Sequence, residues 1–149
     1  MIGNEAHLVK IHHLGLVTGN LEESSELYQK LGYTPESEIT HEKNQGVFVQ
    51  FLVLGAYRIE LIQPENESSP VYKFLKKGGG LHHICYESNN IEATIKYLRD
   101  EYRAICISLK ESYSMIECKV AFFAKPDGEV LEIIQLINGT NYYLPVKKK

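Results

Sequence analysis

The sequence predicts an α+β fold built from two similar halves that pack on each other around one core. Three observations predict this class. The chain has 149 residues, which suits one ordinary domain or two very small ones. Each half gives the same order of patterns, namely strand, helix, strand, strand, strand. A short histidine motif and a short glutamate motif each occur once per half, at nearly constant spacing.

The first half begins with an apolar strand over residues 8–17 and continues with a helix over 21–31. Asn20 stands where an N-cap is expected, and acidic residues fill the first turns, where the helix dipole favours them. Gly32 ends this helix, and Gly55 opens a hairpin turn. The remaining strands of this half are expected at residues 33–40, 46–54 and 57–63.

The second half repeats this order after a polar connection that starts at Pro64 and carries a short helix over residues 69–77. A strand starts at Leu81, and a helix follows over 91–102. A Pro-Asp-Gly turn at 126–128 precedes the last strand. Strands in this half are expected near residues 104–109, 117–124 and 129–136.

An internal repeat relates the two halves. The doublet His12-His13 returns as His82-His83, an offset of 83 − 13 = 70, and Glu60 in IELIQ returns as Glu132 in LEIIQ, an offset of 132 − 60 = 72. Near-equal offsets indicate a genuine repeat, and two copies are too few for a solenoid. The predicted organisation is a first module at 8–64, a linker at 65–79, a second module at 80–136 and a C-terminal tail at 137–149.

Composition excludes several function classes. Lys plus Arg number 16 and Asp plus Glu number 19, so the net charge is 16 − 19 = −3, which offers no basic field for nucleic acid. No apolar run approaches the length that spans a bilayer, and the N-terminus has no signal-peptide pattern. The three cysteines form no CxxC pair. These features predict a cytoplasmic protein with reduced thiols, no nucleic-acid partner and no membrane contact.

The repeated histidine and glutamate residues predict a metal site. Strand alternation sends the two rings of each doublet to opposite faces, and a buried carboxylate in an apolar strand needs a partner. Two histidines and two glutamates at repeat-related positions satisfy one another through one shared divalent ion. Imidazole and carboxylate suit Zn, Ni, Co, Fe or Mn, and one or two further positions would stay open for water or a substrate oxygen.

These motifs resemble the vicinal oxygen chelate superfamily, the glyoxalase and bleomycin-resistance fold. The resemblance rests on HHLGLV, IEL, GLHHICYE and PDGEVLEIIQ and covers about residues 9–136. Within the superfamily, the segment from IELIQP to HHICYE is most similar to methylmalonyl-CoA epimerases. The resemblance implies two paired βαβββ modules that form a curved sheet cleft around the metal, and a homodimer.

The resemblance also implies which residues hold the metal. By motif, the ligands are His13, before the Leu-Gly step, Glu60 in IEL, the second histidine of its doublet, His83, and Glu132 in VLEII. The other histidine of each doublet, His12 or His82, then lies on the opposite face and has a structural role.

The implied chemistry is proton transfer next to a metal-polarised carbonyl, with a small-molecule carbonyl compound or thioester as substrate. Glu132 is the first choice as catalytic base, and Glu60 is its pseudo-symmetric partner. The predicted activity is a metal-dependent isomerase or lyase, most like methylmalonyl-CoA epimerase.

Three other functions stay open at this point. One is a glyoxalase I-like lactoylglutathione lyase, which uses the same four ligands. Another is an extradiol-type dioxygenase, which needs a two-histidine, one-carboxylate face with open positions. The third is a metal-free drug-binding protein of the resistance type.

Overall fold

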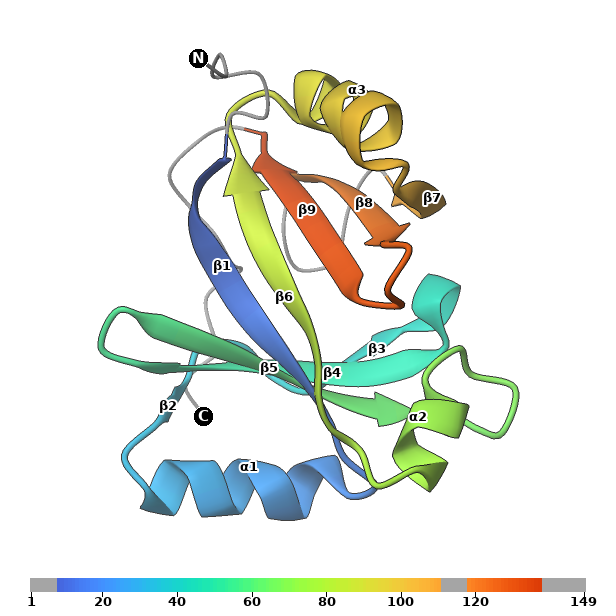
Figure 1. Cartoon of the computed structure of the whole chain (residues 1–149). Coiled ribbons are helices and arrows are strands. Elements are labelled where there is room, and N and C mark those ends of the chain that lie inside the picture. Colours follow the sequence, from blue (N-terminus) through green and yellow to red (C-terminus); the bar gives the residue numbers. More distant parts are fainter. Residues whose placement is uncertain (1–7, 111–117, 138–149) are drawn as a thin grey trace. The chain divides into compact units, whose positions relative to one another are not determined.

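The computed structural model describes residues 8–110 and 118–137, whose helices and strands are shown in Figure 1. The helices are α1 (Leu21–Lys30), α2 (Tyr72–Lys76) and α3 (Ile91–Tyr102), with a 3-10 turn at Lys43–Gln45. The strands are β1 (Leu8–Val17), β2 (Thr34–Pro35), β3 (Thr40–Glu42), β4 (Val47–Leu54), β5 (Tyr57–Pro64), β6 (Gly80–Ser88), β7 (Ile105–Lys110), β8 (Cys118–Ala124) and β9 (Val130–Leu136). Mixed strands with few helices confirm the α+β class.

The described residues form two compact units. The N-terminal unit comprises residues 13–82, and the C-terminal unit comprises residues 8–12 together with 83–110 and 118–137. Strands β1 and β6 contribute residues to both units, because the division falls within each histidine doublet. The expected module boundaries at 8–64 and 80–136 stay a prediction. All but the first residue of the expected tail lie outside the described residues.

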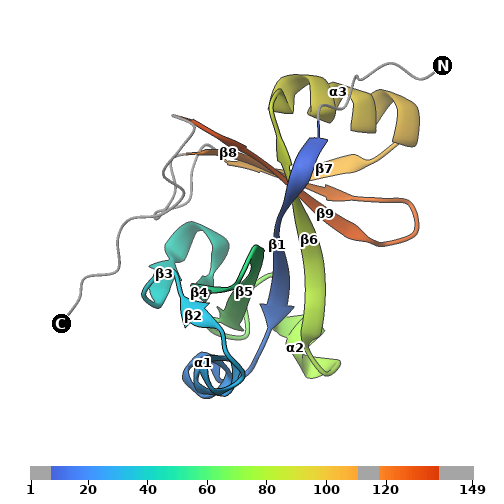
Figure 2. The ribbon, with the colours of Figure 1, turned by 90° about the vertical axis from the view of Figure 1, so that its left-hand side faces the viewer.

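In the N-terminal unit, the strand order is β2-β4-β5-β1, and the short β3 also pairs with β4. The β1–β5 pairing is parallel, whereas β4 and β5 form an antiparallel hairpin. Helix α1 covers one face of this sheet (Figures 1 and 2). The core on that face is built from Leu21 of α1 and the sheet residues Leu52, Ile59 and Leu61, which are at most 4% exposed.

The C-terminal unit repeats this arrangement with the order β6-β9-β8-β7. Strands β6 and β9 are parallel, and β8 and β9 form the antiparallel hairpin. Helix α3 covers one face of the sheet (Figure 1), and its Ile91 packs with Ala121, Phe123 and Ile133. Each unit therefore has a helix-covered sheet face that holds an apolar core.

Hydrogen bonds at the helix N-termini show the repeat at atomic detail. Asn20 caps α1 by accepting from the Glu23 amide at 3.0 Å, as the sequence predicts, and Asn90 caps α3 by accepting from the Ala93 amide at 3.1 Å. A glutamine from the last strand of each hairpin accepts the first helical amide. Gln63 does so for Leu21 at 2.9 Å and Gln135 for Ile91 at 2.8 Å. These bonds satisfy amides that the helices leave unpaired.

The strand expected over residues 33–40 is interrupted. The structure has only the two-residue β2 and the three-residue β3 there. Between them the Phe51 carbonyl accepts from the amides of both Glu36 and Ser37, at 2.8 and 3.3 Å, and the Ser37 hydroxyl accepts from the Phe51 amide at 3.0 Å. The Ser37 hydroxyl thus takes the place of a backbone carbonyl as acceptor for the Phe51 amide, and the regular backbone pairing with β4 stops there. Side-chain pairing of this kind competes with secondary structure.

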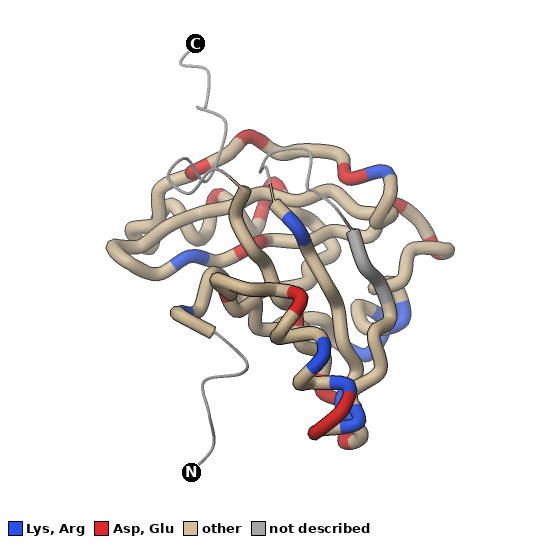
Figure 3. Tube along the Cα trace, turned by 90° about the horizontal axis from the view of Figure 1, so that it is seen from above, with Lys and Arg blue, Asp and Glu red and all other residues tan. Residues whose placement is uncertain are grey.

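Other boundaries differ less from the sequence prediction. Helix α2 is shorter than the expected 69–77, because Ser69 and Pro70 form a turn in which the Tyr72 amide donates to the Ser69 carbonyl at 3.1 Å. Acidic and basic residues are both scattered along the trace (Figure 3). Among the described residues, no helix combines the length and the apolar character needed to cross a bilayer.

Candidate metal centre

The N-terminal unit brings His13 and Glu60 together. The parallel register pairs Gly15 of β1 with Glu60 of β5, and side chains two residues apart on a strand share a face. His13 and Glu60 therefore project from the same face, and His13 Nε2 lies 3.4 Å from Glu60 Oε1. Both residues are buried, with exposed fractions of 0% and 2%.

The C-terminal unit builds the equivalent pair from His83 and Glu132. Here the parallel register pairs Cys85 of β6 with Glu132 of β9, so His83 again lies two residues before the position that faces the glutamate. His83 Nε2 lies 2.8 Å from Glu132 Oε2, and both residues are buried. Each unit thus makes one imidazole–carboxylate pair by the same parallel register.

An aromatic ring packs against the histidine in each unit. Phe51 pairs with Glu60 across the β4–β5 hairpin, and its ring meets His13 edge-on at 5.2 Å. Phe122 pairs with Glu132 across the β8–β9 hairpin, and its ring meets His83 edge-on at 6.1 Å. Edge-on packing of this kind restricts the rotation of the imidazoles, which favours a fixed arrangement of donors.

Strand alternation separates these pairs from the cores. In the N-terminal unit the core residues Ile59 and Leu61 flank Glu60 on β5 and point to the face that α1 covers, so Glu60 points away from the helix. In the C-terminal unit the core residues Leu131 and Ile133 flank Glu132 in the same way on the α3 side. The sheet faces opposite the helices therefore carry the candidate ligands.

The remaining histidines of the doublets lie in other surroundings. His12 is 1% exposed, while His82 is half-buried and its ring meets Phe74 of the connecting helix edge-on at 4.9 Å. His41 on β3 is stacked on Phe48 and has its Nε2 2.9 Å from Glu65 Oε1. The structural role that the sequence predicts for His12 and His82 stays a prediction.

The donor chemistry of the pairs fits a divalent metal. A carboxylate buried in an apolar strand is costly unless it is paired or coordinates a cation. Each pair offers one imidazole nitrogen and one carboxylate, and two such pairs supply the nitrogen and oxygen ligands that Zn, Ni, Co, Fe and Mn accept.

Sequence reasoning missed a third buried carboxylate on the ligand face of the N-terminal unit. Glu42 of β3 is 6% exposed and pairs with Val47 of β4. Residues paired across two strands share a face, and Val47 and Phe51 share a face because they are four residues apart on β4. Phe51 pairs with Glu60, so Glu42 lies on the same sheet face as His13 and Glu60. The pairing of the short β3 strand reveals this position, and the hydropathy pattern alone does not.

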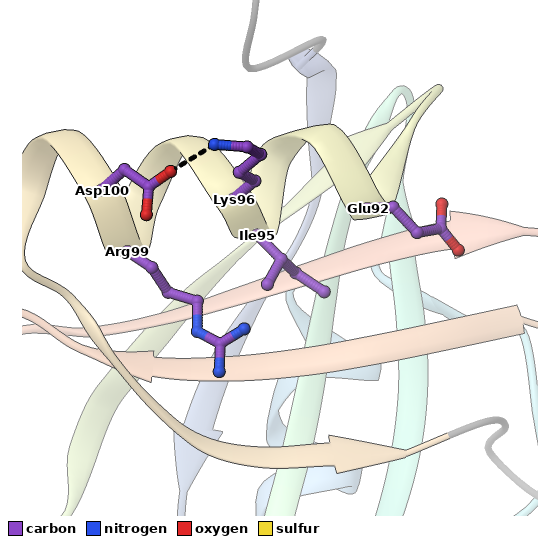
Figure 4. Close-up of a pocket in the computed structure, with 5 residues that line it drawn as sticks. All are labelled: Glu92, Ile95, Lys96, Arg99 and Asp100. Atoms are coloured by element: carbon purple, nitrogen blue, oxygen red, sulfur yellow. Dashed lines mark hydrogen bonds and ion pairs between the residues drawn. The ribbon is translucent and has the colours of Figure 1, made fainter.

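A separate hollow lies along the side of α3, as shown in Figure 4. Its lining residues are Glu92, Ile95, Lys96, Arg99 and Asp100. Lys96 pairs with Asp100 along the helix, and a hydrogen bond from Lys119 holds the pKa of Glu92 below its ordinary value. Paired, exposed charges of this kind are typical of a solvated helix face.

A comparison with protein families identifies the chain's relatives. The model of the Glyoxalase/Bleomycin resistance protein/Dioxygenase superfamily matches residues 12–122. The chain belongs to this superfamily. The match includes both histidine doublets and Glu60, and ends before Glu132. Membership confirms the family resemblance, and with it the glyoxalase-like fold.

Several curated relatives are named as epimerases. The chain is 38% identical over 94 residues to "Methylmalonyl-CoA epimerase, mitochondrial" of Dictyostelium discoideum, which covers 62% of this chain and 57% of that protein. It is 33% identical over 93 residues to "Ethylmalonyl-CoA/methylmalonyl-CoA epimerase" of Cereibacter sphaeroides, covering 61% and 69%. The chain spans just over half the length of the mitochondrial relatives. These relatives confirm the predicted closeness to methylmalonyl-CoA epimerases.

A solved structure agrees over more of the chain. A Streptomyces coelicolor methylmalonyl-CoA epimerase variant in complex with 2-nitronate-propionyl-CoA superposes with a TM-score of 0.75 at 26% identity. This alignment covers 87% of the present chain and 98% of the other. The fold similarity therefore includes both repeats.

Proposed function

We propose that the chain is a divalent-metal-dependent epimerase that acts on an acyl-CoA of the methylmalonyl-CoA type. The observation that carries this proposal is the repeat-related imidazole–carboxylate pair in each unit, held on the sheet face opposite the helix. A binding protein without a metal has no need for two buried carboxylates in the same relation to two histidines. The names of the relatives supply the substrate class.

The proposed metal centre combines both pairs around one ion. His13, Glu60, His83 and Glu132 are its protein ligands. When bound, the ion supplies a Lewis acid that stabilises negative charge on the thioester oxygen. The histidines would bind the ion through Nε2, the atom that each of them turns toward its glutamate.

The carboxylates of the site move the proton. A hydrogen on the carbon between a thioester and a carboxylate is weakly acidic, so a positioned base is needed to remove it. Glu132 is the proposed base, and Glu60 is its counterpart in the other half of the repeat. Both side chains are buried, which keeps competing water from the carbon that loses its proton.

A direct assay tests this proposal. The purified chain, loaded with cobalt, nickel, zinc or manganese, is given a single epimer of methylmalonyl-CoA in D₂O. We expect the other epimer to appear and deuterium to enter at the α-carbon, both observed by proton NMR and chiral separation. The Glu132→Gln variant, with its metal content measured alongside, is expected to lose at least about 100-fold in rate.

The same assay distinguishes the lyase alternative. The metal-loaded chain is also given the hemithioacetal of methylglyoxal and glutathione. Turnover of the hemithioacetal with none of the acyl-CoA would replace the proposed epimerase with a glyoxalase I-like lyase. No turnover of either substrate in any metal form would reject the proposed chemistry.

We also propose a cytoplasmic homodimer, as the family resemblance implies. A net charge of −3 and three free cysteines are compatible with a reducing compartment. Light scattering during gel filtration tests the assembly, with about twice the 17.0 kDa chain mass expected. A fluorescent fusion in the source cell tests the location.

A further inference from the structure

We propose that residues 138–149 add a strand to the exposed edge of β1 and so cover residues 8–12 in the C-terminal unit. This inference is independent of the proposed epimerase activity. The covered stretch ends directly before the proposed ligand His13, so the added strand would also steady the part of β1 that leads into this histidine.

Residues 8–12 form one edge of the sheet in the C-terminal unit. They lie beside β6, where Lys10 Nζ is 3.4 Å from Glu87 Oε2. The pairing of β1 with β5 begins only at Leu14. Among the described residues, no strand therefore lies along the side of residues 8–12 that faces away from β6. An edge of this kind is a template for pairing with any extended segment that reaches it.

The side chains along this edge are apolar and exposed. Leu8, Val9 and Ile11 are 44%, 56% and 55% exposed. Because successive side chains of a strand point to opposite faces, both faces of this edge carry apolar surface. Single exposed apolar residues are ordinary, but a cluster of them on an edge strand is a site that natural proteins cover or protect.

The other edge of the same sheet, β7, is protected in a different way. Ile105 and Ile107 are exposed there, but the register of β7 with β8 shifts between Cys106 and Ser108. An irregularity of this kind bends a strand and discourages further pairing at an edge. The edge at residues 8–12 is therefore the better partner for an added strand.

The end of β9 brings the following residues within reach of this edge. Glu87 of β6 pairs with Ile134 of β9 and contacts Lys10 of β1, so these three residues stand in one row across the sheet. Strand β1 starts at the end of the sheet where β6 and β9 finish (Figure 1). Ile137, three residues beyond Ile134, therefore lies level with the start of β1.

The sequence after Ile137 has a suitable length and composition. Residues 138–141 are Asn-Gly-Thr-Asn, which is typical of a turn, and residues 142–146 are Tyr-Tyr-Leu-Pro-Val, an apolar run as long as the stretch 8–12. Tyr and Val favour strands, and Pro is tolerated in an edge strand. From Ile137 to Tyr142 an extended chain spans about 17 Å, and the open side of β1 is three strand spacings from β9, about 14 Å.

The short connection favours this segment over a second copy of the chain. A segment tethered so close to its site has an effective concentration on the order of millimolar there. A second copy would have to reach a similar concentration in solution to compete for the same edge. The proposed occupant is therefore the segment 138–149, and the test distinguishes it from a second copy and from residues 1–7.

Hydrogen exchange of the full chain, measured by NMR, tests the docking. Leu144→Asp places a charge in the middle of the apolar run, and we expect the amides of residues 8–12 that point away from β6 to exchange at least about 10-fold faster than in wild type. Thr140→Asp is the matched control, because it adds the same charge in the connection, and it should leave these rates within about twofold of wild type. Exchange of the β7 amides should be equal in all three proteins.

The outcomes that contradict the docking are distinct. Edge amides that are unprotected in wild type, or whose protection survives in a folded Leu144→Asp variant, would overturn the proposal. Protection that falls on dilution would show that a second copy covers the edge, and protection lost only on deletion of residues 1–7 would give that place to the N-terminal segment. If Leu144→Asp does not fold, as judged by exchange of the buried Phe123 amide, Leu144→Ala gives the same comparison without a charge.

Discussion

At the scale of single residues, adjacent histidines in a doublet have different surroundings because a strand turns neighbouring side chains to opposite faces. His13 and His83 each meet a buried glutamate. His82 meets a phenylalanine of α2 instead. The family resemblance implies which ring of each doublet is a ligand, and the parallel register of the structure places that ring beside its glutamate.

Removal of one proposed ligand should abolish tight metal binding. His83→Ala removes an imidazole from the proposed site, and we expect metal affinity to fall by more than about 100-fold. This loss is larger than is typical when a residue that only hydrogen-bonds to a metal ligand is removed. Equilibrium dialysis followed by elemental analysis measures this. His41→Ala is the matched control, because His41 pairs with Glu65 on a half-exposed surface, and it should keep one equivalent of metal. Equal metal content in the two variants would contradict the assignment of His83.

At the scale of elements, the two halves use the same local devices to attach a helix to a sheet. The asparagine caps and the glutamine acceptors occur at repeat-related positions, at 20 and 90 and at 63 and 135. The hydroxyl pair Thr18–Ser24, at 2.7 Å, likewise corresponds to Ser88–Thr94, at 2.9 Å. The sequence offsets near 70 therefore reflect side-chain contacts that occur in both halves of the chain, and not only similar hydropathy.

Loss of either asparagine cap should lower stability by a similar amount. Asn20→Ala and Asn90→Ala each remove the acceptor for one helical amide, and we expect the free energy of unfolding to fall by about 1 kcal/mol in each case. Urea unfolding followed by circular dichroism measures the change. Metal stoichiometry should stay the same, because neither residue is a proposed ligand. A change below 0.2 kcal/mol, on the order of experimental error, in both variants would contradict the capping role.

Gly79, before β6, has a more specific role than other glycines with positive φ. It adopts φ +68, and an added Cβ would lie 2.7 Å from the Val17 carbonyl oxygen. Gly55 has a similar φ of +61 with nothing within 4 Å of that position. Gly79→Ala should therefore lower the free energy of unfolding by about 1–3 kcal/mol more than Gly55→Ala, which carries the left-handed backbone cost of about 1 kcal/mol alone. Thermal unfolding of both variants checks the difference, and equal losses would contradict it.

The regular elements were predictable from sequence, and the irregular ones were not. Strands β4, β5 and β9 have long apolar patterns, and α1 and α3 have caps and acidic first turns. The interruption after Pro35 depends on Ser37, whose hydroxyl accepts a distant amide from Phe51, and no local pattern encodes that contact. The position of Glu42 likewise depends on the partner that its three-residue strand selects.

At the scale of the whole molecule, the proposed ion would take two ligands from each half of the repeat. Ligands that bind only the folded chain stabilise it by mass action. At a free metal concentration about 100 times the dissociation constant, the gain is about 2.7 kcal/mol. For a chain of this size the melting temperature should rise by about 5–10 °C.

Calorimetric scans of the chelator-treated chain, with and without each divalent metal, measure this shift. The Glu60→Gln variant should show a smaller rise than wild type, because it loses one charged ligand. A melting temperature unchanged by every metal would contradict a metal centre that joins the two halves.

The most direct test of the central proposal is a crystal structure of the cobalt-loaded chain, with an anomalous difference map recorded at the cobalt absorption edge. The proposal predicts one strong peak per chain, about 2.0–2.2 Å from Nε2 of both histidines and from a carboxylate oxygen of both glutamates. A peak bound by only one His–Glu pair, or a peak elsewhere on the chain, would contradict a single centre formed by His13, Glu60, His83 and Glu132.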